Sequence, residues 1–428
     1  MNLQTTLLTT FFTITVLCQL ALGNSALASE KITQLTLDLG EKITLPSKIM
    51  GNQRELYVRL PPGYSESKQH YSVIYLLDAN LYYVKDLYFH TVALIDRMTK
   101  NGPIGDIPQS IIVAVANKDF SEWHQEATRK PEDLQRFLVE ELQPWVKNNY
   151  RILDNQVLIG QSYAASMVLG ILPRYPNSFD MVIAVDPIFT SQKSIDKVIS
   201  AYEKMPNTGA TIYAAQSEKE DTDVLLIKNA VEKSNPQAVN IIRQAFLQEN
   251  HSSVIYPAIN NGLRHHFADY KRPSHTLLAK QDFKYPDIVD FFAKRDKKYQ
   301  LTTTDKYLKS TVGHAAYYYL SNKRFDLAWP LYELNEKENY VKYIIDRIAQ
   351  RFFNQNDFQD ALTAWKHLSQ KFPQLPTAQH GLGKAYEQLK HKGQALASYK
   401  KAVELATGQK DEDLVEFEAS LKRFEGGE

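Results

Sequence analysis

The chain has 428 residues, of which 43% are hydrophobic and 23% charged, and its 50 Lys and Arg residues are almost balanced by 49 Asp and Glu. These values exclude a disordered chain, a collagen-like repeat and a protein with many membrane spans. A formal charge of +1 also argues against a nucleic-acid-binding surface, since phosphate binding needs an excess of cations on one face. Single cores rarely exceed about 250 to 300 residues, so the length predicts two or three domains.

Residues 1–28 have the features of a secretory signal peptide. They contain no charged side chain, include an apolar stretch from Phe11 to Leu22, and end in Ala26-Leu27-Ala28, the small-x-small pattern of a cleavage site. A retained membrane anchor is the alternative, but the stretch is shorter than the ~20 apolar residues that a span needs. Cys18, the only cysteine, lies in this segment. Cleavage before Ser29 would therefore leave a mature protein without disulfides, a thiolate nucleophile, cysteine-ligated zinc or a membrane span.

Residues 29–300 are predicted to form an α/β domain, because short runs rich in Val and Ile alternate there with longer amphipathic stretches. The predicted strands are Leu56 to Leu60, Ser72 to Leu77, Ile111 to Ala116, Gln156 to Gly160, Met181 to Val185, Thr211 to Ala215 and Asn240 to Phe246. Apolar residues recur at helical spacing from Pro131 to Tyr150. Strands alternating with helices favour a mostly parallel sheet with helices on both faces, as in the α/β-hydrolase fold.

Two residues in this domain form the core of the chemical prediction, and the first is a serine in the motif Gly160-Gln161-Ser162-Tyr163-Ala164. The apolar run Val157 to Ile159 before it predicts a buried strand, and Ala164 to Leu172 after it predicts a helix. A strand, sharp turn and helix make up a nucleophile elbow, in which small residues let the two elements approach while the serine hydroxyl projects above the sheet edge. We predict Ser162 as the nucleophile; a purely structural turn is the alternative.

The second is the base that must take the proton of the serine hydroxyl. In this arrangement the partners follow in the order serine, acid, histidine, and His251, His265, His266 and His275 qualify by position. His251 lies in a polar loop after the last predicted strand, where ligand chemistry gathers in open α/β sheets. His265 and His266 fall inside a predicted helix and His275 lies beyond the sheet, so we predict His251 as the general base.

The acid that orients the imidazole stays open. Glu218 is the first carboxylate after the strand Thr211 to Ala215 and is the preferred acid. Asp186, directly after the strand Met181 to Val185, is the alternative acid, and a serine-histidine dyad is the third option.

Acyl transfer also needs backbone N–H donors for the oxyanion. One donor is predicted at Tyr163, next to the nucleophile, and the other at Asn80, in the loop after the strand Ser72 to Leu77. This chemistry requires no metal and no organic cofactor.

After about Thr311 the strand pattern gives way to a repeat of small and aromatic residues. Ile348, Ala349, Phe352, Ala361, Trp365 and Leu368 recur 34 positions later as Leu382, Gly383, Tyr386, Ala395, Tyr399 and Ala402. An earlier unit, spaced by 33, contains Ala315, Ala316, Tyr319, Ala328 and Tyr332. The pattern resembles the tetratricopeptide repeat, a pair of antiparallel helices, with an ordinary helical bundle as the alternative. Residues 301–428 are therefore predicted to be all-α, able to bind a protein or peptide partner or to self-associate.

The motifs of the first part together resemble the putative-esterase family of α/β-hydrolases. They occur in the family's order, namely Arg54 to Tyr64, Val73 to Asp78, Gly160 to Ala164, Glu249 to Val254 and Gly262-Leu263. The family includes siderophore (enterochelin-type) esterases, feruloyl esterases, S-formylglutathione hydrolase and mycolyltransferases. The resemblance covers about residues 40 to 270 and implies a carboxyl-ester hydrolase with Ser162 and His251 in the catalytic roles.

The substrate pocket is expected to differ from that of typical members, because Ala79 and Ala164 stand where glycine is common. The run Asp186 to Phe189 likewise replaces serine-rich and tryptophan-rich sequence that often lines the pocket. Candidate walls are Tyr82, Tyr83, Trp123 and Phe189. Such aromatic residues are also common in ordinary cores.

We therefore expect an exported serine hydrolase that cleaves small carboxylic esters, of siderophore type or another type, through an acyl-enzyme. Asn250-His251-Ser252 is a glycosylation sequon whose glycan would obstruct the base, which favours a bacterial periplasm. Two alternatives are a catalytically silent scaffold whose repeats bind a partner, and an acyltransferase or peptidase that uses the same serine.

Overall fold

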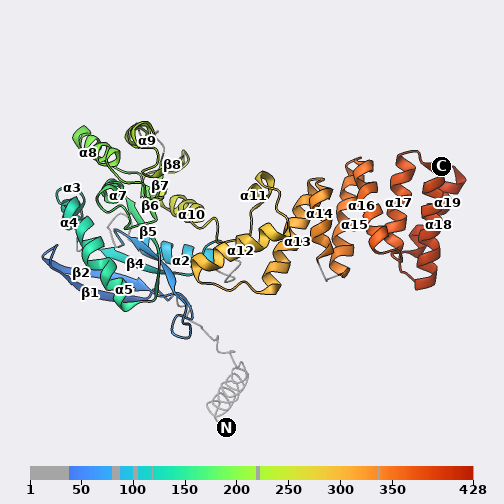
Figure 1. Cartoon of the computed structure of the whole chain (residues 1–428), viewed down its shortest axis with the longest axis horizontal. Helices are drawn as coiled ribbons and strands as arrows, with labels where there is room; N and C mark the ends of the chain where they lie inside the picture. The colour runs from blue at the N-terminus through green and yellow to red at the C-terminus, as the bar shows by residue number, and fades with distance from the viewer. Residues whose placement is uncertain are drawn as a thin grey trace, which may run out of the picture. The chain divides into compact units, whose positions relative to one another are not determined.

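The computed structural model describes residues 38–79, 87–99, 105–117, 119–217, 222–334 and 338–427. Its elements lie in the compact unit Gly40–Glu428, in which a sheet with flanking helices is followed by a helical region (Figure 1). This arrangement confirms the predicted fold class. The proposed signal segment lies outside the described residues, and the domain boundary near residue 300 stays a prediction.

The sheet has eight strands in the order β1-β2-β4-β3-β5-β6-β7-β8. They are β1 (Glu41–Ser47), β2 (Asn52–Arg59), β3 (Tyr71–Leu76), β4 (Ser110–Ala116), β5 (Ile152–Gln161), β6 (Met181–Val185), β7 (Thr211–Gln216) and β8 (Asn240–Ala245). The strands from β4 to β8 in this order pair in parallel, and β1 and β2 pair antiparallel at one edge. The carboxyl ends of the six parallel strands therefore meet along one edge, where α/β proteins place their ligand chemistry.

All seven predicted strands are present, and β1 is an additional one. Its side chains alternate between exposed and partly buried positions, and it carries Pro46 in an edge strand that pairs only with β2. Proline is tolerated at such an edge because no second neighbour needs its N–H. The run is too polar to resemble the fully buried strands β3 and β4, which explains why the sequence pattern missed it.

Helices cover both faces of the sheet. The first face packs into the main core with α4 (Pro131–Arg136), the π-helical segment η2 (Phe137–Leu142), α5 (Gln143–Asn149), α6 (Tyr163–Leu169), α7 (Ile171–Arg174), α8 (Gln192–Glu203) and α9 (Thr222–Ser234). The second face carries α10 (Ile255–His266), which packs on β6 and β7 and on α2 (Leu87–Thr99). Gly262 allows this approach, because a Cβ there would lie 2.7 Å from the side chain of Ile183 in β6.

The helical region contains α11 (His275–Lys280) to α19 (Leu414–Gly426), and its three predicted repeat units each contain two helices. The intervening elements are α12 (Tyr285–Tyr299), α13 (Asp305–Ser321), α14 (Phe325–Glu333), α15 (Glu338–Asn354), α16 (Phe358–Lys371), α17 (Pro376–Gln388) and α18 (Lys392–Gln409). Small residues bring these helices together, since a Cβ on Gly383 would lie 2.6 Å from the ring of Tyr399, and one on Gly381 even closer to Trp365. The repeated small and aromatic positions are therefore helix contacts.

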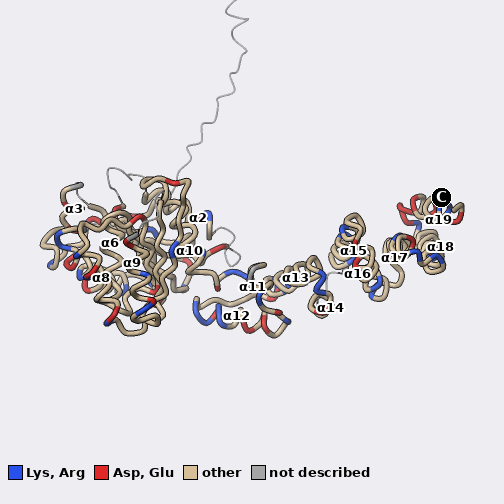
Figure 2. Tube along the Cα trace, turned by 90° about the horizontal axis from the view of Figure 1, so that it is seen from above, with Lys and Arg blue, Asp and Glu red and all other residues tan. Residues whose placement is uncertain are grey.

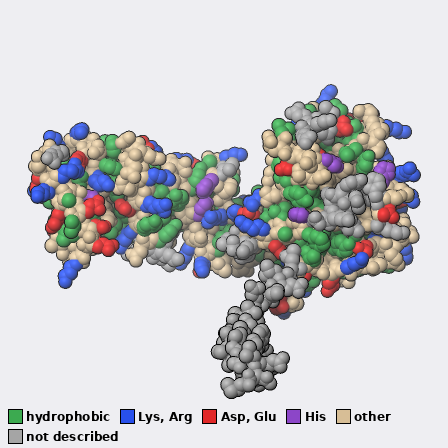
Figure 3. All heavy atoms as spheres, turned by 180° about the vertical axis from the view of Figure 1, so that it is seen from behind, with side chains coloured by type: hydrophobic (Ala, Val, Ile, Leu, Met, Phe, Trp, Pro, Cys, Tyr) green, Lys and Arg blue, Asp and Glu red, His purple; other side chains and the backbone are tan. Residues whose placement is uncertain are grey.

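Figure 2 shows residues of both charge signs interspersed along the chain, and Figure 3 shows charged side chains of both signs on the face that it draws. Many of them form surface pairs, such as Arg423 with Glu387 and Lys323 with Asp360. The described residues on that face therefore form no extended field of one sign. Within the described part of the chain, no helix combines the length and apolar character needed to cross a bilayer.

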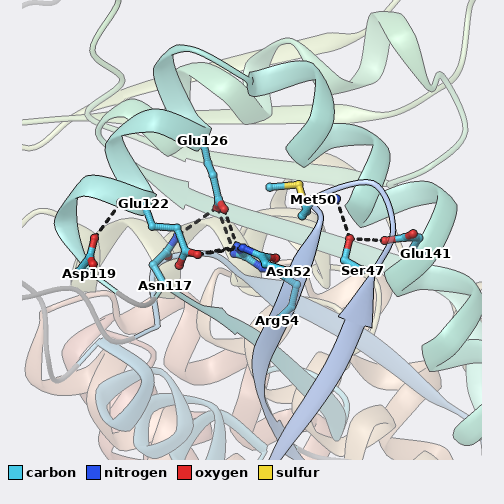
Figure 4. Close-up of polar contacts among 9 residues, drawn as sticks. All are labelled: Ser47, Met50, Asn52, Arg54, Asn117, Asp119, Glu122, Glu126 and Glu141. Atoms are coloured by element: carbon cyan, nitrogen blue, oxygen red, sulfur yellow. Dashed lines mark hydrogen bonds and ion pairs between the residues drawn. The ribbon is translucent and has the colours of Figure 1, made fainter.

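A polar network with a buried centre joins β2 to α3 (Phe120–Thr128), the helix that follows β4 (Figure 4). Arg54 of β2 is 1% exposed and donates two hydrogen bonds to Glu126 of α3, at 2.5 and 3.1 Å. Asn117 donates a third to the same carboxylate at 3.3 Å, and Asn52 donates to Glu122 at 3.0 Å. The network fixes α3 against the sheet. α3 also contacts α6, the helix that begins directly after Ser162.

We expect Glu126→Gln to lower the free energy of unfolding by about 3 kcal/mol, because the buried Arg54 guanidinium loses its close carboxylate and keeps only the Glu122 carboxylate, 3.7 Å away. Urea unfolding followed by circular dichroism measures this loss. The matched control is Glu232→Gln, which removes the carboxylate of the exposed Lys228–Glu232 pair of α9 and should cost less than about 1 kcal/mol. Equal losses in the two variants would contradict the structural role given to the Arg54–Glu126 pair.

Candidate active site

Ser162 occupies a sharp turn between β5 and α6. Its φ of 60° and ψ of −125° lie in a region that residues with a Cβ rarely adopt. Gly160 permits the turn, because a Cβ there would lie 2.9 Å from the carbonyl oxygen of Ala164. Ala164 is itself buried, so its methyl group fits where glycine is usual. Strained backbone at a partly buried serine between a strand and a helix is the local geometry of a nucleophile elbow.

Two further residues with positive φ follow neighbouring strands. Asp78 (φ 61°) comes after β3 and Asp186 (φ 45°) after β6, and these strands flank β5. The register pairs the last residue of β5 with Val185, and the amide of Ser162 donates to the Val185 carbonyl at 2.9 Å. Ser162 and Asp186 therefore lie at adjacent strand ends, on the edge where catalytic groups are expected.

Asp186 binds His251. Its Oδ2 lies 3.0 Å from His251 Nδ1 and accepts a hydrogen bond from the Ser217 hydroxyl at 2.5 Å, while its Oδ1 accepts from the Ser217 amide at 2.6 Å. Because an ionised carboxylate only accepts, the ring proton belongs on Nδ1, which leaves Nε2 as the basic nitrogen. The structure thus brings together the predicted base and the alternative acid, Asp186, and adds Ser217, which the sequence analysis missed.

The electrostatics keep Asp186 ionised. Burial raises the pKa of this carboxyl, but the hydrogen bonds from His251 and Ser217 outweigh it and hold the pKa below its usual value. Its side chain is 12% exposed, whereas that of His251 is 48% exposed. A protected carboxylate and an accessible imidazole are what a base needs if it is to exchange protons with a substrate.

Two sets of hydrogen bonds hold the loop that carries His251: one from Gln161, before Ser162, and one within the loop, to the side chain of Asn250. Gln161, next to the nucleophile, donates from Nε2 to the carbonyl oxygen of His251 at 2.5 Å. The side chain of Asn250 accepts from the amides of Ser252 and Ser253 at 2.9 and 3.1 Å, which fixes the entry into α10. Gln161 therefore holds the backbone of His251, and Asn250 holds the residues that follow it, so the loop that carries the imidazole is fixed on both sides of His251.

Of the other predicted site residues, the structure describes Tyr163 but not Asn80 or Glu218. Tyr163 is the first residue of α6, so its amide belongs to the helix N-terminus, where N–H groups favour negative charge. Its ring meets that of His124 of α3 edge-on, with 5.4 Å between the centroids. Asn80 and Glu218, predicted as oxyanion donor and preferred acid, lie outside the described residues. No element of the structure therefore tests those two assignments.

A cavity of about 490 Å³ adjoins the elbow, with Tyr163, Ser166 and Ile188 in its lining. The Ile188 amide donates to the Ser162 carbonyl at 3.2 Å, and the Ser166 hydroxyl donates to the Ile188 carbonyl at 2.6 Å. Phe189, one of the predicted walls, lines the cavity. Tyr82, Tyr83 and the side chain of Trp123 lie outside the described residues. Among the described residues, no three His, Asp, Glu or Cys side chains cluster as metal ligands would.

Comparisons with known proteins bear on the family and on the fold. Residues 47–258 match the family model described as "Putative esterase". Among solved structures, an IroE-like serine hydrolase from Shewanella oneidensis is 18% identical with a TM-score of 0.52, covering 69% of this chain and 98% of its own. An uncharacterised protein from Capnocytophaga ochracea is 14% identical with a TM-score of 0.50, covering 89% and 99%. These similarities show the fold. No curated protein sequence matches the chain.

Proposed function

We propose that this chain, whose residues 47–258 match the model of the putative esterase family, hydrolyses esters through an acyl-enzyme on Ser162. The observation that carries the proposal is the convergence of a strained serine, after β5, with an Asp186–His251 pair anchored at the next strand. A hydroxyl, a base and an acid at adjacent strand ends are the components of acyl transfer.

In the proposed reaction, His251 takes the proton of the Ser162 hydroxyl through Nε2, and the serine oxygen attacks the ester carbonyl. Backbone N–H groups, that of Tyr163 among them, stabilise the oxyanion of the tetrahedral intermediate. The protonated imidazole then gives its proton to the leaving alcohol, and the Asp186 carboxylate stabilises the imidazolium while it exists. Water, activated by the same imidazole, releases the carboxylic acid and restores the serine.

Asp186 takes the role of the acid in this proposal instead of Glu218, the acid preferred from the sequence. Asp186 has a hydrogen bond to the ring nitrogen of His251 and two from Ser217, and these contacts give it the position and the charge that the role requires. The serine-histidine dyad is disfavoured for the same reason, since the imidazole has a carboxylate partner.

The cellular setting and the helical region complete the proposal. The uncharged apolar segment ending in Ala26-Leu27-Ala28 supports export, and the sequon at Asn250 favours a bacterial periplasm. The paired helices from α13 to α18, with their repeated small and aromatic positions, support tetratricopeptide-like repeats that bind a protein or peptide partner or a second copy.

A panel of esters tests the function. We expect the purified protein to hydrolyse at least one class among short-chain, aromatic and macrolactone esters, with the carboxylic acid as the product detected by liquid chromatography. Transfer of the acyl group to an added alcohol or amine in preference to water would indicate an acyltransferase. A folded protein that hydrolyses none of the three classes would contradict the proposal.

A further inference from the structure

The cavity beside the nucleophile combines an apolar interior with a charged rim. Met167, Val198 and Ala201 contribute apolar surface from α6 and α8, and Phe189 adds an aromatic ring. Gly170 keeps the space open, because a Cβ there would lie 3.2 Å from Gln135, a buried residue of α4. This part of the cavity suits a chain or ring without charge.

The rim is positive. Among the described lining residues, Arg129, Arg174 and Lys197 are exposed cations and Glu132 is the single carboxylate, which leaves an excess of two positive charges. Glu132 is bound to Lys197, and this hydrogen bond, together with the charges of Lys197 and Arg174, holds the pKa of Glu132 below its usual value. Among the described residues, neither arginine forms an ion pair with a carboxylate. The guanidinium carbon of Arg174 lies 5.8 Å from the centroid of the Tyr175 ring, and both guanidinium groups keep N–H groups without a carboxylate partner that can bind an anion.

The position of His251 indicates which part of an ester would enter the cavity. The imidazole must reach the leaving oxygen to protonate it, so the alcohol part lies on the side of His251. The cavity is lined from α3, α4, α6, α7, α8 and the segment after Asp186, and none of its described lining residues belongs to the loop from Phe246 to Val254 that carries His251. Ser162 itself does not line the cavity, but Tyr163, the next residue, does. An acyl group that stays on the serine can therefore extend past Tyr163 into this space.

We propose that this cavity is the acyl subsite and that it selects esters whose acyl group is apolar along its length and ends in a carboxylate held by Arg129 and Arg174. The inference rests on the proposed function, because it requires the acyl group to be carried by Ser162. Guanidinium groups match the planar carboxylate in shape as well as in charge, which favours this anion over a neutral polar end.

Two matched esters test the subsite. 4-Nitrophenyl hydrogen adipate carries a free carboxylate at the end of its acyl chain, and 4-nitrophenyl methyl adipate has the same chain with that end neutral. We expect wild type to have the higher kcat/KM for the anionic ester. The double substitution Arg129→Gln and Arg174→Gln should lower that kcat/KM about five- to tenfold, as two exposed charge pairs predict, and change that of the neutral ester less than about twofold. Added salt at about 0.5 M should also reduce the preference, because exposed charges are screened.

The control is Lys147→Gln, which removes an exposed cation of α5 that does not line the cavity and should leave both esters unaffected. Equal kcat/KM values for the two esters in wild type, or equal losses for both in the double variant, would overturn the anionic subsite. If Ser162→Ala still abolished hydrolysis of the neutral ester, the proposed function would survive that result. If wild type cleaved neither adipate ester but hydrolysed another ester of the panel, the subsite alone would be overturned; failure on the whole panel would remove both proposals.

Discussion

Replacing Ser162 with alanine is expected to lower kcat for ester hydrolysis by about 10⁴- to 10⁶-fold, the largest effect that any single change in this protein should have. The acyl-enzyme cannot form without the hydroxyl, so only binding and oxyanion stabilisation of direct water attack would remain. Hydrolysis of a 4-nitrophenyl ester under saturating conditions measures the loss.

The matched control is Ser234→Ala, which removes an exposed hydroxyl of α9 that donates only to the Ala230 carbonyl of the same helix. It should retain full activity. The circular dichroism spectrum of Ser162→Ala should equal that of wild type, because alanine keeps the Cβ and the turn. A folded Ser162→Ala variant with more than about a tenth of wild-type activity would contradict the assignment of the nucleophile.

Replacing Asp186 with asparagine is expected to lower kcat by about 10² to 10⁴-fold. Asparagine has nearly the same shape, but it carries no charge to stabilise the imidazolium and can donate a hydrogen bond to Nδ1, which would favour the wrong tautomer of His251. The informative comparison is Glu218→Gln, which should retain activity within about twofold. The opposite ranking would restore Glu218 as the acid, and full activity in both variants would indicate a dyad.

A milder change at Ser217 tests the support of the acid through pH. Ser217→Ala removes the hydroxyl hydrogen bond that helps to hold the pKa of Asp186 down, although the backbone amide of residue 217 still donates. The pKa of Asp186 should therefore rise, and the carboxyl carbon signal of Asp186 in a carbon-13 NMR titration should shift at a higher pH than in wild type. An unchanged titration of Asp186 in the folded variant would contradict this role of the Ser217 hydroxyl.

The sequence predicted the parts of the site that depend on local pattern. Ser162 was identifiable because a buried strand, a glycine and a helix surround it within one short segment, and the structure places it in a strained turn with the same neighbours. His251 followed from its position after the last strand. Both inferences use information carried within about twenty residues of the position concerned.

Other parts depend on contacts between distant segments. Asp186 and Glu218 each follow a strand, so their sequence positions could not rank them, whereas the 3.0 Å contact with His251 does favour Asp186. Ser217 has no motif, and it matters because β7 lies beside β6 and places the residue against Asp186. The positive rim likewise arises from cations that α3, α7 and α8 bring together. The sequence feature that could have indicated Ser217 is its position directly after the last residue of β7.

Mass spectrometry of the protein treated with a fluorophosphonate ester tests the central claim most directly, since this reagent bonds to serines activated by a base. We predict one adduct per chain, located by peptide mapping on Ser162, absent in Ser162→Ala and formed much more slowly in Asp186→Asn. A folded wild-type protein that hydrolyses esters without labelling, or that is labelled at another residue, would contradict the account.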